Sequence, residues 1–413
     1  MTPAFDRRSM LRGSLTLAAA GLLTACAADE TPESSATPSP TATTPSPTPT
    51  PGRVESSGRP VMASSYGANG THYPDDLPWL GEAAALELIA ECSWADIESA
   101  VRGLDAATVT EGVVIRVKPG TLTGNGSGSS SQPVLASVGD LSWTRNVLIC
   151  PLEGFSSVTL DATGARLDQC ARLSLFGMVS PGTLVMTQCA AMQVGWSRFN
   201  GLSITRGARG VALYELVLGF RQDENDTVGI RPIDELEMID ISRHGCVFGP
   251  SVKPAESGAH CDTMQLEGTG SGPFGPLLSV DCVDYGSSNA AELLHTQVTL
   301  ADYQHCLILG GQLPWQVYPL RPGDYQGDPN AFAGGCQDVR LTECVVAGAV
   351  GKMGFTQVQN STLSYTPVDK QQPSVSGAWS VDESIGGWDR ATIMALQEIP
   401  DYEIPTLRSL WAW

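Results

Sequence analysis

Residues 94–122, which read WADIESAVRGLDAATVTEGVVIRVKPGTL, decide the fold. The first half of this stretch has the apolar spacing of a short amphipathic helix, which we place at 93–104. A strand-length apolar run follows from Val113 and ends at a Pro-Gly turn. The preceding stretch GEAAALELIAEC, at 81–92, also has a helical pattern, so we predict two helices followed by a strand.

Beyond Val113 the chain is a series of short apolar runs. Examples are GTLVMTQC, NGLSITRG and HCLILGG, which are separated by Gly, Asn, Asp and Ser. Signals for two-residue hairpins are scarce, and the runs recur about every 20–24 residues, which is the period of a solenoid coil. We therefore predict an all-β fold of stacked coils over 105–365, with the segment 61–104 covering their N-terminal end.

The stretch 94–122 also resembles the opening of the pectate-lyase-like family of right-handed parallel β-helix proteins. In that family a helix caps the open end of the solenoid, and a first strand then closes on a Pro-Gly turn. The resemblance covers residues 80–365 and implies a single-stranded right-handed parallel β-helix with an N-terminal helical cap. It does not select one activity, because lyases, hydrolases, epimerases and non-catalytic binders share this fold.

The ends of the chain read as targeting and covering segments. Residues 1–26 have adjacent arginines, a short apolar run and then LTAC, which resemble a twin-arginine export signal and a bacterial lipobox. The resemblance implies that Cys26 carries a lipid and that the protein is extracytoplasmic, anchored to the bacterial cell membrane. Residues 27–60 are rich in Pro, Thr and Ser and predict a disordered linker. Residues 366–413 are expected to form a C-terminal cap or tail.

The charge balance limits the partners. The chain has 24 Lys+Arg against 44 Asp+Glu, a net charge of −20, which disfavours nucleic acid because phosphate binding needs basic patches. We expect the partner to be an extracellular polysaccharide or a cell-wall glycan. We also expect the protein to be a monomer. The loop 221–232 carries Asp223, Glu224 and Asp226, which form either a solvated turn or a Ca²⁺ site. No cofactor other than Ca²⁺ is suggested.

Cysteines recur at nearly constant intervals. Two such series are Cys150, Cys170, Cys189 and Cys261, Cys282, Cys306. Near-constant spacing indicates equivalent positions in stacked coils, and a buried free cysteine behaves as a small hydrophobic residue. We therefore favour ladders of free thiols over a disulfide framework.

The stretch GAHCDTMQLEG, at 258–268, carries the main candidate site. A bend after Asp262 would place His260, Asp262 and Gln265 on one outer surface, with Cys261 inside before the bend and Met264 inside after it. His-x-Asp-x-x-Gln also resembles a pattern in β-helix proteins that act on or bind glycans. A carboxylate can fix the tautomer of an imidazole, and an amide can bind sugar hydroxyls. The alternative is a polar ladder that only satisfies turn backbone groups.

Further candidates follow from an assumed alignment of coils. If Cys246 stacks on Cys261, the stretch RHG lies beside GAHCD, which adds Arg243, His244 and Lys253 to the catalytic candidates. The predicted substrate-binding residues are Gln265, Glu256, Arg231, Trp315 and Tyr318.

Three functions remain open on the sequence. The first is a polysaccharide lyase or epimerase, which needs a base and neutralisation of a uronate. The second is a non-catalytic protein that binds glycan or cell wall. The third is a glycoside hydrolase, which needs two carboxyl groups at a set separation and has no convincing pair in the sequence.

Overall fold

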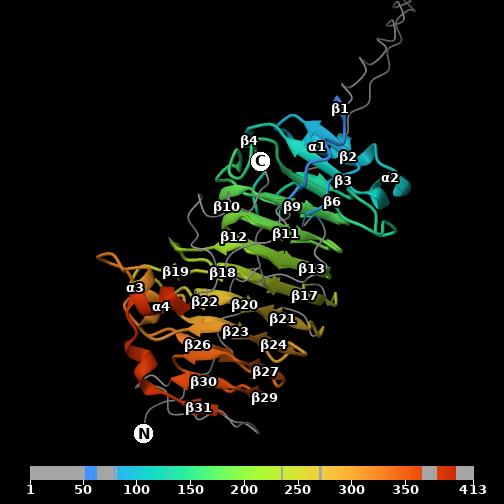
Figure 1. The fold of residues 1–413 in the computed structure, drawn as a ribbon. Helices are drawn as coiled ribbons and strands as arrows, with labels where there is room; N and C mark the ends of the chain where they lie inside the picture. Colours follow the sequence, from blue (N-terminus) through green and yellow to red (C-terminus); the bar gives the residue numbers. More distant parts are fainter. Residues whose placement is uncertain are drawn as a thin grey trace, which may run out of the picture. The chain divides into compact units, whose positions relative to one another are not determined.

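Parallel strands of successive coils stack into long rows (Figure 1). Apart from β1 (Gly52–Glu55), which pairs antiparallel with β2, the strands pair in parallel with the strand at the same place in the next coil. The computed structural model describes residues 52–62, 79, 81–128, 130–233, 236–268, 272–364 and 379–396. They all belong to the second of two compact units, Met1–Thr48 and Pro49–Trp413. The predicted right-handed parallel β-helix is confirmed.

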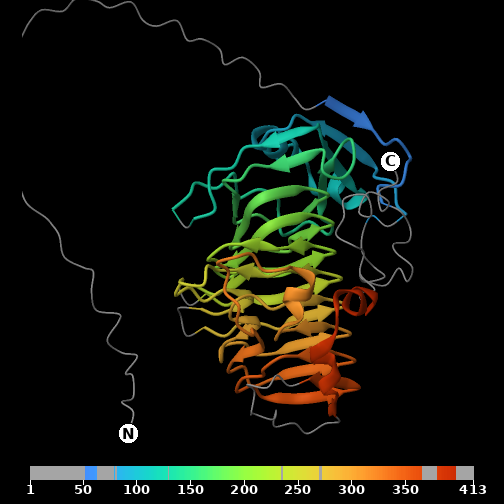
Figure 2. The same cartoon turned by 90° about the vertical axis from the view of Figure 1, so that its left-hand side faces the viewer.

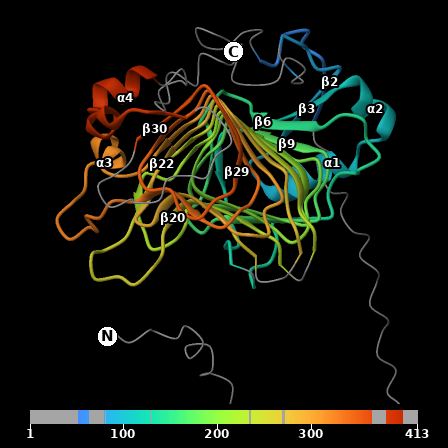
Figure 3. The same cartoon turned by 90° about the horizontal axis from the view of Figure 1, so that it is seen from below.

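The strands of each coil contribute to three rows, which are seen end-on in Figure 3. The first row contains β1, β2 (Leu86–Ala90), β3 (Val113–Val117), β6 (Val147–Pro151), β9 (Leu173–Phe176), β11 (Gln193–Gly195), β13 (Arg209–Tyr214), β17 (Ile239–His244), β21 (Leu277–Val280), β24 (Ala301–Gln304), β27 (Val339–Thr342) and β29 (Phe355–Gln359). The second row contains β4 (Gly120–Leu122), β7 (Val158–Leu160), β14 (Val217–Leu218), β18 (Val247–Phe248), β22 (Val283–Tyr285), β25 (Leu307–Leu309), β28 (Val345–Ala347), β30 (Ser361–Ser364) and β31 (Trp379–Val381). The third row contains β5 (Leu135–Ala136), β8 (Ala165–Asp168), β16 (Val228–Arg231), β20 (Asp262–Leu266), β23 (Ala290–Leu294) and β26 (Asn330–Gly334). The long strands β10 (Val179–Thr187) and β12 (Arg198–Thr205) run through the second and third rows.

The two kinds of corner around the second row differ in length. The corner from the first to the second row is a tight turn with one residue in the left-handed conformation, such as Gly245, Asp281 or His305. The corner from the second to the third row holds longer loops, 219–227, 249–261 and 310–329. These loops carry the strand pair β15 (Arg221–Gln222) and β19 (Ser251–Val252) and the helix α3 (Leu313–Val317). Loops of this kind can position functional groups on a rigid scaffold.

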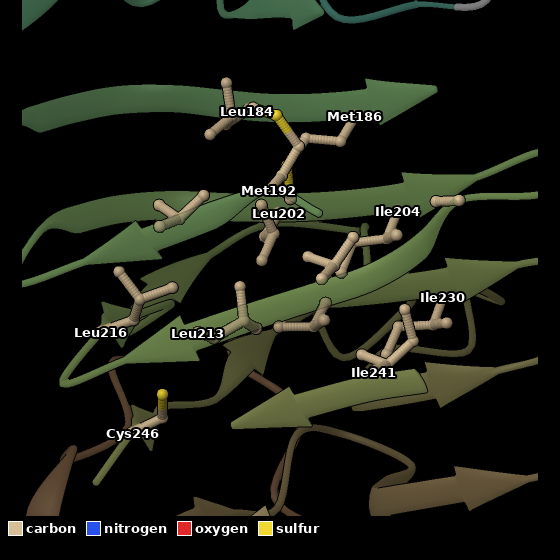
Figure 4. Close-up of a cluster of buried hydrophobic side chains, with 14 of the residues drawn as sticks. Leu184, Met186, Met192, Leu202, Ile204, Leu213, Leu216, Ile230, Ile241 and Cys246 are labelled. Atoms are coloured by element: carbon tan, nitrogen blue, oxygen red, sulfur yellow. The ribbon is translucent and has the colours of Figure 1, made fainter. Parts of the chain in front are cut away.

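The core fills the interior of the coils. Alternate residues of each strand point inward, as Leu184, Met186, Leu202 and Ile204 do in Figure 4. At the N-terminal end the helix α1 (Trp94–Arg102) covers this core with Trp94 and other buried residues, beside the short helix α2 (Ala106–Glu111). The predicted helical cap is therefore confirmed. Its physical role is to shield apolar side chains that the first coil would otherwise expose.

Two sequence predictions near the N-terminus are wrong. Residues 81–92 are not a helix, because Leu86–Ala90 forms β2 and pairs with β3. Leu86, Leu88 and Ala90 all point into the core, so every second residue of this stretch is apolar, as in a half-buried strand. Its pairing with β3 outweighs its helical propensity. Gly52–Glu55 forms β1, although it falls inside the predicted linker 27–60.

The ten cysteines of the described residues are all free. Cys170 and Cys189 lie in the core with their thiols in contact, as predicted. Cys150 was expected there too, but it lies outside the first row, beside Arg116. The second predicted series is also wrong, because Cys282 and Cys306 stack with Cys246 and Cys344, whereas Cys261 belongs to another corner.

The remaining elements lie near the C-terminal end of the solenoid (Figure 2). They are the 3₁₀ helix η1 (Glu383–Gly387) and the helix α4 (Arg390–Leu396), which packs with α3 against the outer face of the second row. No helix of the described part is long and apolar enough to cross a membrane. The predicted signal segment 1–26, the lipid site Cys26 and the final residues 397–413 lie outside the described residues.

Candidate functional site

A groove of about 220 Å³ lies on the outer face of the third row. Its floor consists of outward side chains from β10 and β12, which alternate with core residues in these strands. Loop residues before β5 and turn residues after β12 and β16 form its sides. The lining residues are Ser127, Gly128, Arg166, Val185, Thr187, Ser203, Thr205, Arg206, Arg231 and Ile233.

The strand register shows how the outer face continues beyond the groove. Thr187 pairs with Thr205, and Thr205 pairs with Arg231. Glu267 follows β20 and His295 follows β23, so these two residues continue the same outer line over the next two coils. Neighbouring residues on this line are ~4.8 Å apart along the solenoid. The line therefore leads from hydroxyl groups through a cation to a carboxylate and an imidazole.

Arg231 is fixed by residues on both sides. Its Nε donates to Oε1 of Gln265 at 3.1 Å, and its Nη2 forms an ion pair with Asp226. Gly229 makes room for the guanidinium, because a Cβ there would lie 2.9 Å from Nη1 of Arg231. The side chain of Arg231 is still 37% exposed, so this cation is ordered and also accessible.

Asp226 links Arg231 to a second, buried acid. The backbone N–H of Asp262 donates to Oδ1 of Asp226 at 2.9 Å, and the side-chain amide of Asn289 donates to Oδ1 of Asp262 at 2.7 Å. Burial raises the pKa of Asp262 to about 7, and the charges of Asp226 and Glu267 act in the same direction. Burial also raises the pKa of Asp226, whereas Arg231 opposes this increase. Asp262 therefore binds a proton close to neutral pH.

His295 is the imidazole on this face. Its Nε2 lies 3.8 Å from the carboxylate of Glu267, and both side chains are more than a third exposed. His295 was not among the site residues predicted from the sequence. A second histidine–carboxylate pair, His305 with Asp281 at 2.7 Å, lies at the corner between the first and second rows, away from the groove.

The structure separates the three residues of the predicted motif. Gln265 contacts Arg231, and Asp262 contacts Asn289, but Asp262 has no exposed surface. His260 is exposed and forms no hydrogen bond or ion pair with any described residue. None of the three lines the groove directly. The predicted inward direction of Met264 is confirmed.

Two predicted catalytic residues are excluded by burial. His244 ends β17 and stacks on Tyr214 with ring centroids 5.6 Å apart; burial lowers its pKa. Arg243 lies inside the solenoid, where it forms ion pairs with Asp284 and Glu292. The assumed stacking of Cys246 on Cys261 was wrong, because these residues directly precede different strands, β18 and β20, of one coil.

The other predicted residues lie among the loops between the second and third rows. Lys253 donates to the carbonyl of Ala259 at 2.7 Å, and Glu256 is exposed in the same loop. Trp315 is buried and donates to the carbonyl of Gly327 at 3.1 Å, so it packs its loop and offers no ring to a sugar. Tyr318 donates to Gln222 at 2.7 Å. The only predicted site residue that lines the groove is Arg231.

Arg166, Arg206 and Asn289 were not predicted from the sequence. Arg166 alternates with core residues in ARLD, so its outward direction was readable, but its neighbours in adjacent coils were not. Within the described residues, no group of three or more His, Cys, Asp or Glu side chains is arranged to hold a metal ion. The acidic loop instead uses Asp226 to hold Arg231.

Comparison with known proteins gives structural similarity only. No protein-family model and no curated protein matches the chain. A pectate lyase structure is 13% identical, with a TM-score of 0.38 over 73% of this chain and 80% of the lyase. The A-module of a mannuronan C-5 epimerase from Azotobacter vinelandii is 10% identical, with a TM-score of 0.34 over 70% of this chain and 94% of the module. A rhamnogalacturonan lyase is 9% identical, with a TM-score of 0.30 over 67% and 82%. Similarity at this level says nothing about the activity of this chain.

Proposed function

We propose that the protein binds an anionic polysaccharide in the groove and acts on it as a polysaccharide lyase or epimerase. The observation that supports this proposal is the gathering of Arg166, Arg206 and Arg231 at one groove of a strongly acidic chain. Guanidinium groups bind carboxylates through paired N–H donors. A uronate chain matches such a groove, and the hydroxyl groups of Thr187 and Thr205 on its floor suit sugar hydroxyls.

The proposed chemistry begins with removal of the proton next to the uronate carboxyl group. This step needs a base and a cation that stabilises the developing negative charge. Arg231 supplies the cation, because Gln265 and Asp226 hold its guanidinium in place. His295 supplies the base, since it lies one coil beyond Gln265 and a neutral imidazole nitrogen can accept a proton. Glu267 orients the imidazole.

The alternatives use the same surface differently. A non-catalytic glycan-binding protein would need the arginines but no base. A hydrolase would need two carboxyl groups that both reach the glycosidic bond, and the full burial of Asp262 disfavours this use of Asp226 and Asp262.

The proposal includes the place of action. We propose that residues 1–26 direct export, that a lipid on Cys26 anchors the protein outside the cytoplasm, and that a linker carries the β-helix away from the membrane. The RR pair and LTAC in the sequence support it. Metabolic labelling with a fatty acid tests it: label should enter the protein and be absent from Cys26→Ala.

The test of the activity is a panel of polyuronates incubated with the purified protein. Absorbance of unsaturated uronates reports lyase activity, deuterium incorporation from solvent reports epimerase activity, and new reducing ends without absorbance report hydrolysis. His295→Ala should lower turnover by roughly 10²–10⁴-fold, the usual contribution of a positioned acid–base group. His305→Ala is the matched control, because it removes an imidazole paired with a carboxylate on another corner.

The outcomes separate the functions. Loss of turnover in His295→Ala, with binding retained and His305→Ala unaffected, supports the enzyme. Retention of polyuronates without any product supports the binding protein. Equal turnover in both histidine variants contradicts the role given to His295.

A further inference from the structure

Behind Arg231 lies an acid that the proposed chemistry does not use. Asp262 is fully buried, and among the described residues its Oδ2 has no hydrogen-bond partner. Its Oδ1 accepts a hydrogen bond from the amide of Asn289, and the backbone of Ala290 also favours the ionised form. Burying a carboxylate without a cation is unfavourable. Ionisation of Asp262 therefore destabilises the folded protein.

We propose that Asp262 is a positioning residue that takes up a proton and thereby sets, through Asp226, how much positive charge Arg231 presents to the groove. The path is short. The backbone N–H of Asp262 donates to Oδ1 of Asp226, and Oδ2 of Asp226 contacts Nη2 of Arg231. This inference rests on the proposed function for its ligand, but its central test needs no ligand.

The charged groups around Asp262 support the idea of a proton-binding site. Asp226 and Glu267 both disfavour its ionised form. Arg221 donates to the backbone carbonyl of Asp226 at 2.9 Å. From the loop 249–261, Lys253 donates to the carbonyl of Ala259.

Among the described residues, the neighbours on the remaining sides also place no cation in contact with the carboxyl group of Asp262. His260 is exposed in the segment before β20, and His295 is paired with Glu267. Glu292 of the next coil points into the solenoid, toward Arg243. Arg231 is therefore the cation in direct contact with Asp226, and Asp262 lies behind Asp226. Arg221 also interacts with Asp226 through its charge.

The two protonation states should affect an anionic ligand differently. When Asp262 is protonated, the cluster of Asp226, Asp262 and Arg231 has no net charge. When Asp262 ionises, the cluster becomes negative and repels a carboxylate in the groove. A unit charge about 10 Å away through partly buried protein changes affinity by roughly three- to tenfold. Binding of a uronate oligomer should therefore weaken as the pH rises through neutrality.

The central test follows the Nε–Hε resonance of Arg231 by NMR from pH 5 to pH 9 in the purified protein. Its assignment comes from the absence of this resonance in Arg231→Lys. All samples carry His295→Gln, so that the imidazole beside Glu267 cannot contribute to a change in the resonance. The resonance should show an inflection near the Asp262 pKa of about 7, and Asp262→Asn should abolish it. Asp240→Asn, an exposed acid on β17 in the left-handed conformation that Asn tolerates, should retain it.

An inflection that survives in Asp262→Asn, or no inflection in the parent protein, overturns the inference. If Asp262→Asn does not fold, Glu267→Gln provides the test, since Glu267 is partly exposed. Removing its charge should move the inflection to lower pH, and an unchanged midpoint would contradict the proposal. Trigalacturonate binding, measured from pH 5 to pH 9, adds the functional result. An Asp262-dependent inflection of the Arg231 resonance without trigalacturonate binding would support this inference and count against the proposed function alone.

Discussion

Asp262→Asn should stabilise the protein at alkaline pH. Moving the pKa of this carboxyl from its ordinary 3.8 to about 7 corresponds to about 4 kcal/mol, since each pKa unit is worth about 1.36 kcal/mol. Because the folded-state pKa is raised, this stability is fully present below pH ~4 and is lost as the pH rises through ~7. Between pH 5 and pH 9 the wild type should therefore lose about 3 kcal/mol relative to the variant.

The assay is thermal unfolding of both proteins at closely spaced pH values. The relevant quantity is the difference in melting temperature between them, because effects common to the whole chain cancel. It should change by roughly 5 °C in favour of Asp262→Asn between pH 5 and pH 9. A constant offset from altered contacts with Asn289 would not alter this slope. Asp240→Asn serves as the control and should show a flat difference. A flat difference for Asp262→Asn would refute the assignment of a buried, proton-binding acid.

Two further predictions concern other parts of the fold. Arg243→Met should destabilise the protein by about 3–5 kcal/mol, because Asp284 and Glu292 would lose their cation inside the solenoid. Combining it with Asp284→Leu and Glu292→Met should recover much of the loss in denaturant unfolding, and no recovery would mean that the cluster does more than neutralise charge. Gly229→Ala should weaken uronate binding while the melting temperature changes little, since its new Cβ would displace the guanidinium of Arg231. Unchanged binding in a calorimetric titration would show that this placement of Arg231 is not needed.

The architecture was predictable because it follows from local signals. Strand-length apolar runs recur at a fixed period, and the stretch 94–122 combines the cap helix with the first closed coil. The stretch 81–92 shows the limit of this approach, because it fits both periods and only its pairing with β3 makes it a strand. Pattern alone could not decide between the two.

The site was less predictable because it depends on which coils are neighbours. Loops of different length lie between the rows, so equal spacing in sequence does not mean equal position in the solenoid. The 15-residue interval from Cys246 to Cys261 suggested that the two cysteines lie in adjacent coils. They lie in one coil, because the loop 249–261, which ends at Cys261, accounts for most of this interval. This error brought Arg243 and His244 into the predicted site, and it concealed His295, which the register places on the line of Arg231.

Whether a buried acid points into the solenoid or connects to its outer surface decides whether its charge can influence a bound ligand. Asp262 and Glu292 lie on paired strands of the third row, and both are fully buried acids. Glu292 points inward, where it forms an ion pair with Arg243 and no ligand can reach it. Asp262 connects outward through Asp226 to an exposed guanidinium. A change in charge at Glu292 can therefore affect stability alone, whereas a change at Asp262 can reach the groove. The difference arises because Asp262 begins β20 in contact with the loop residue Asp226, a contact that strand periodicity alone does not locate.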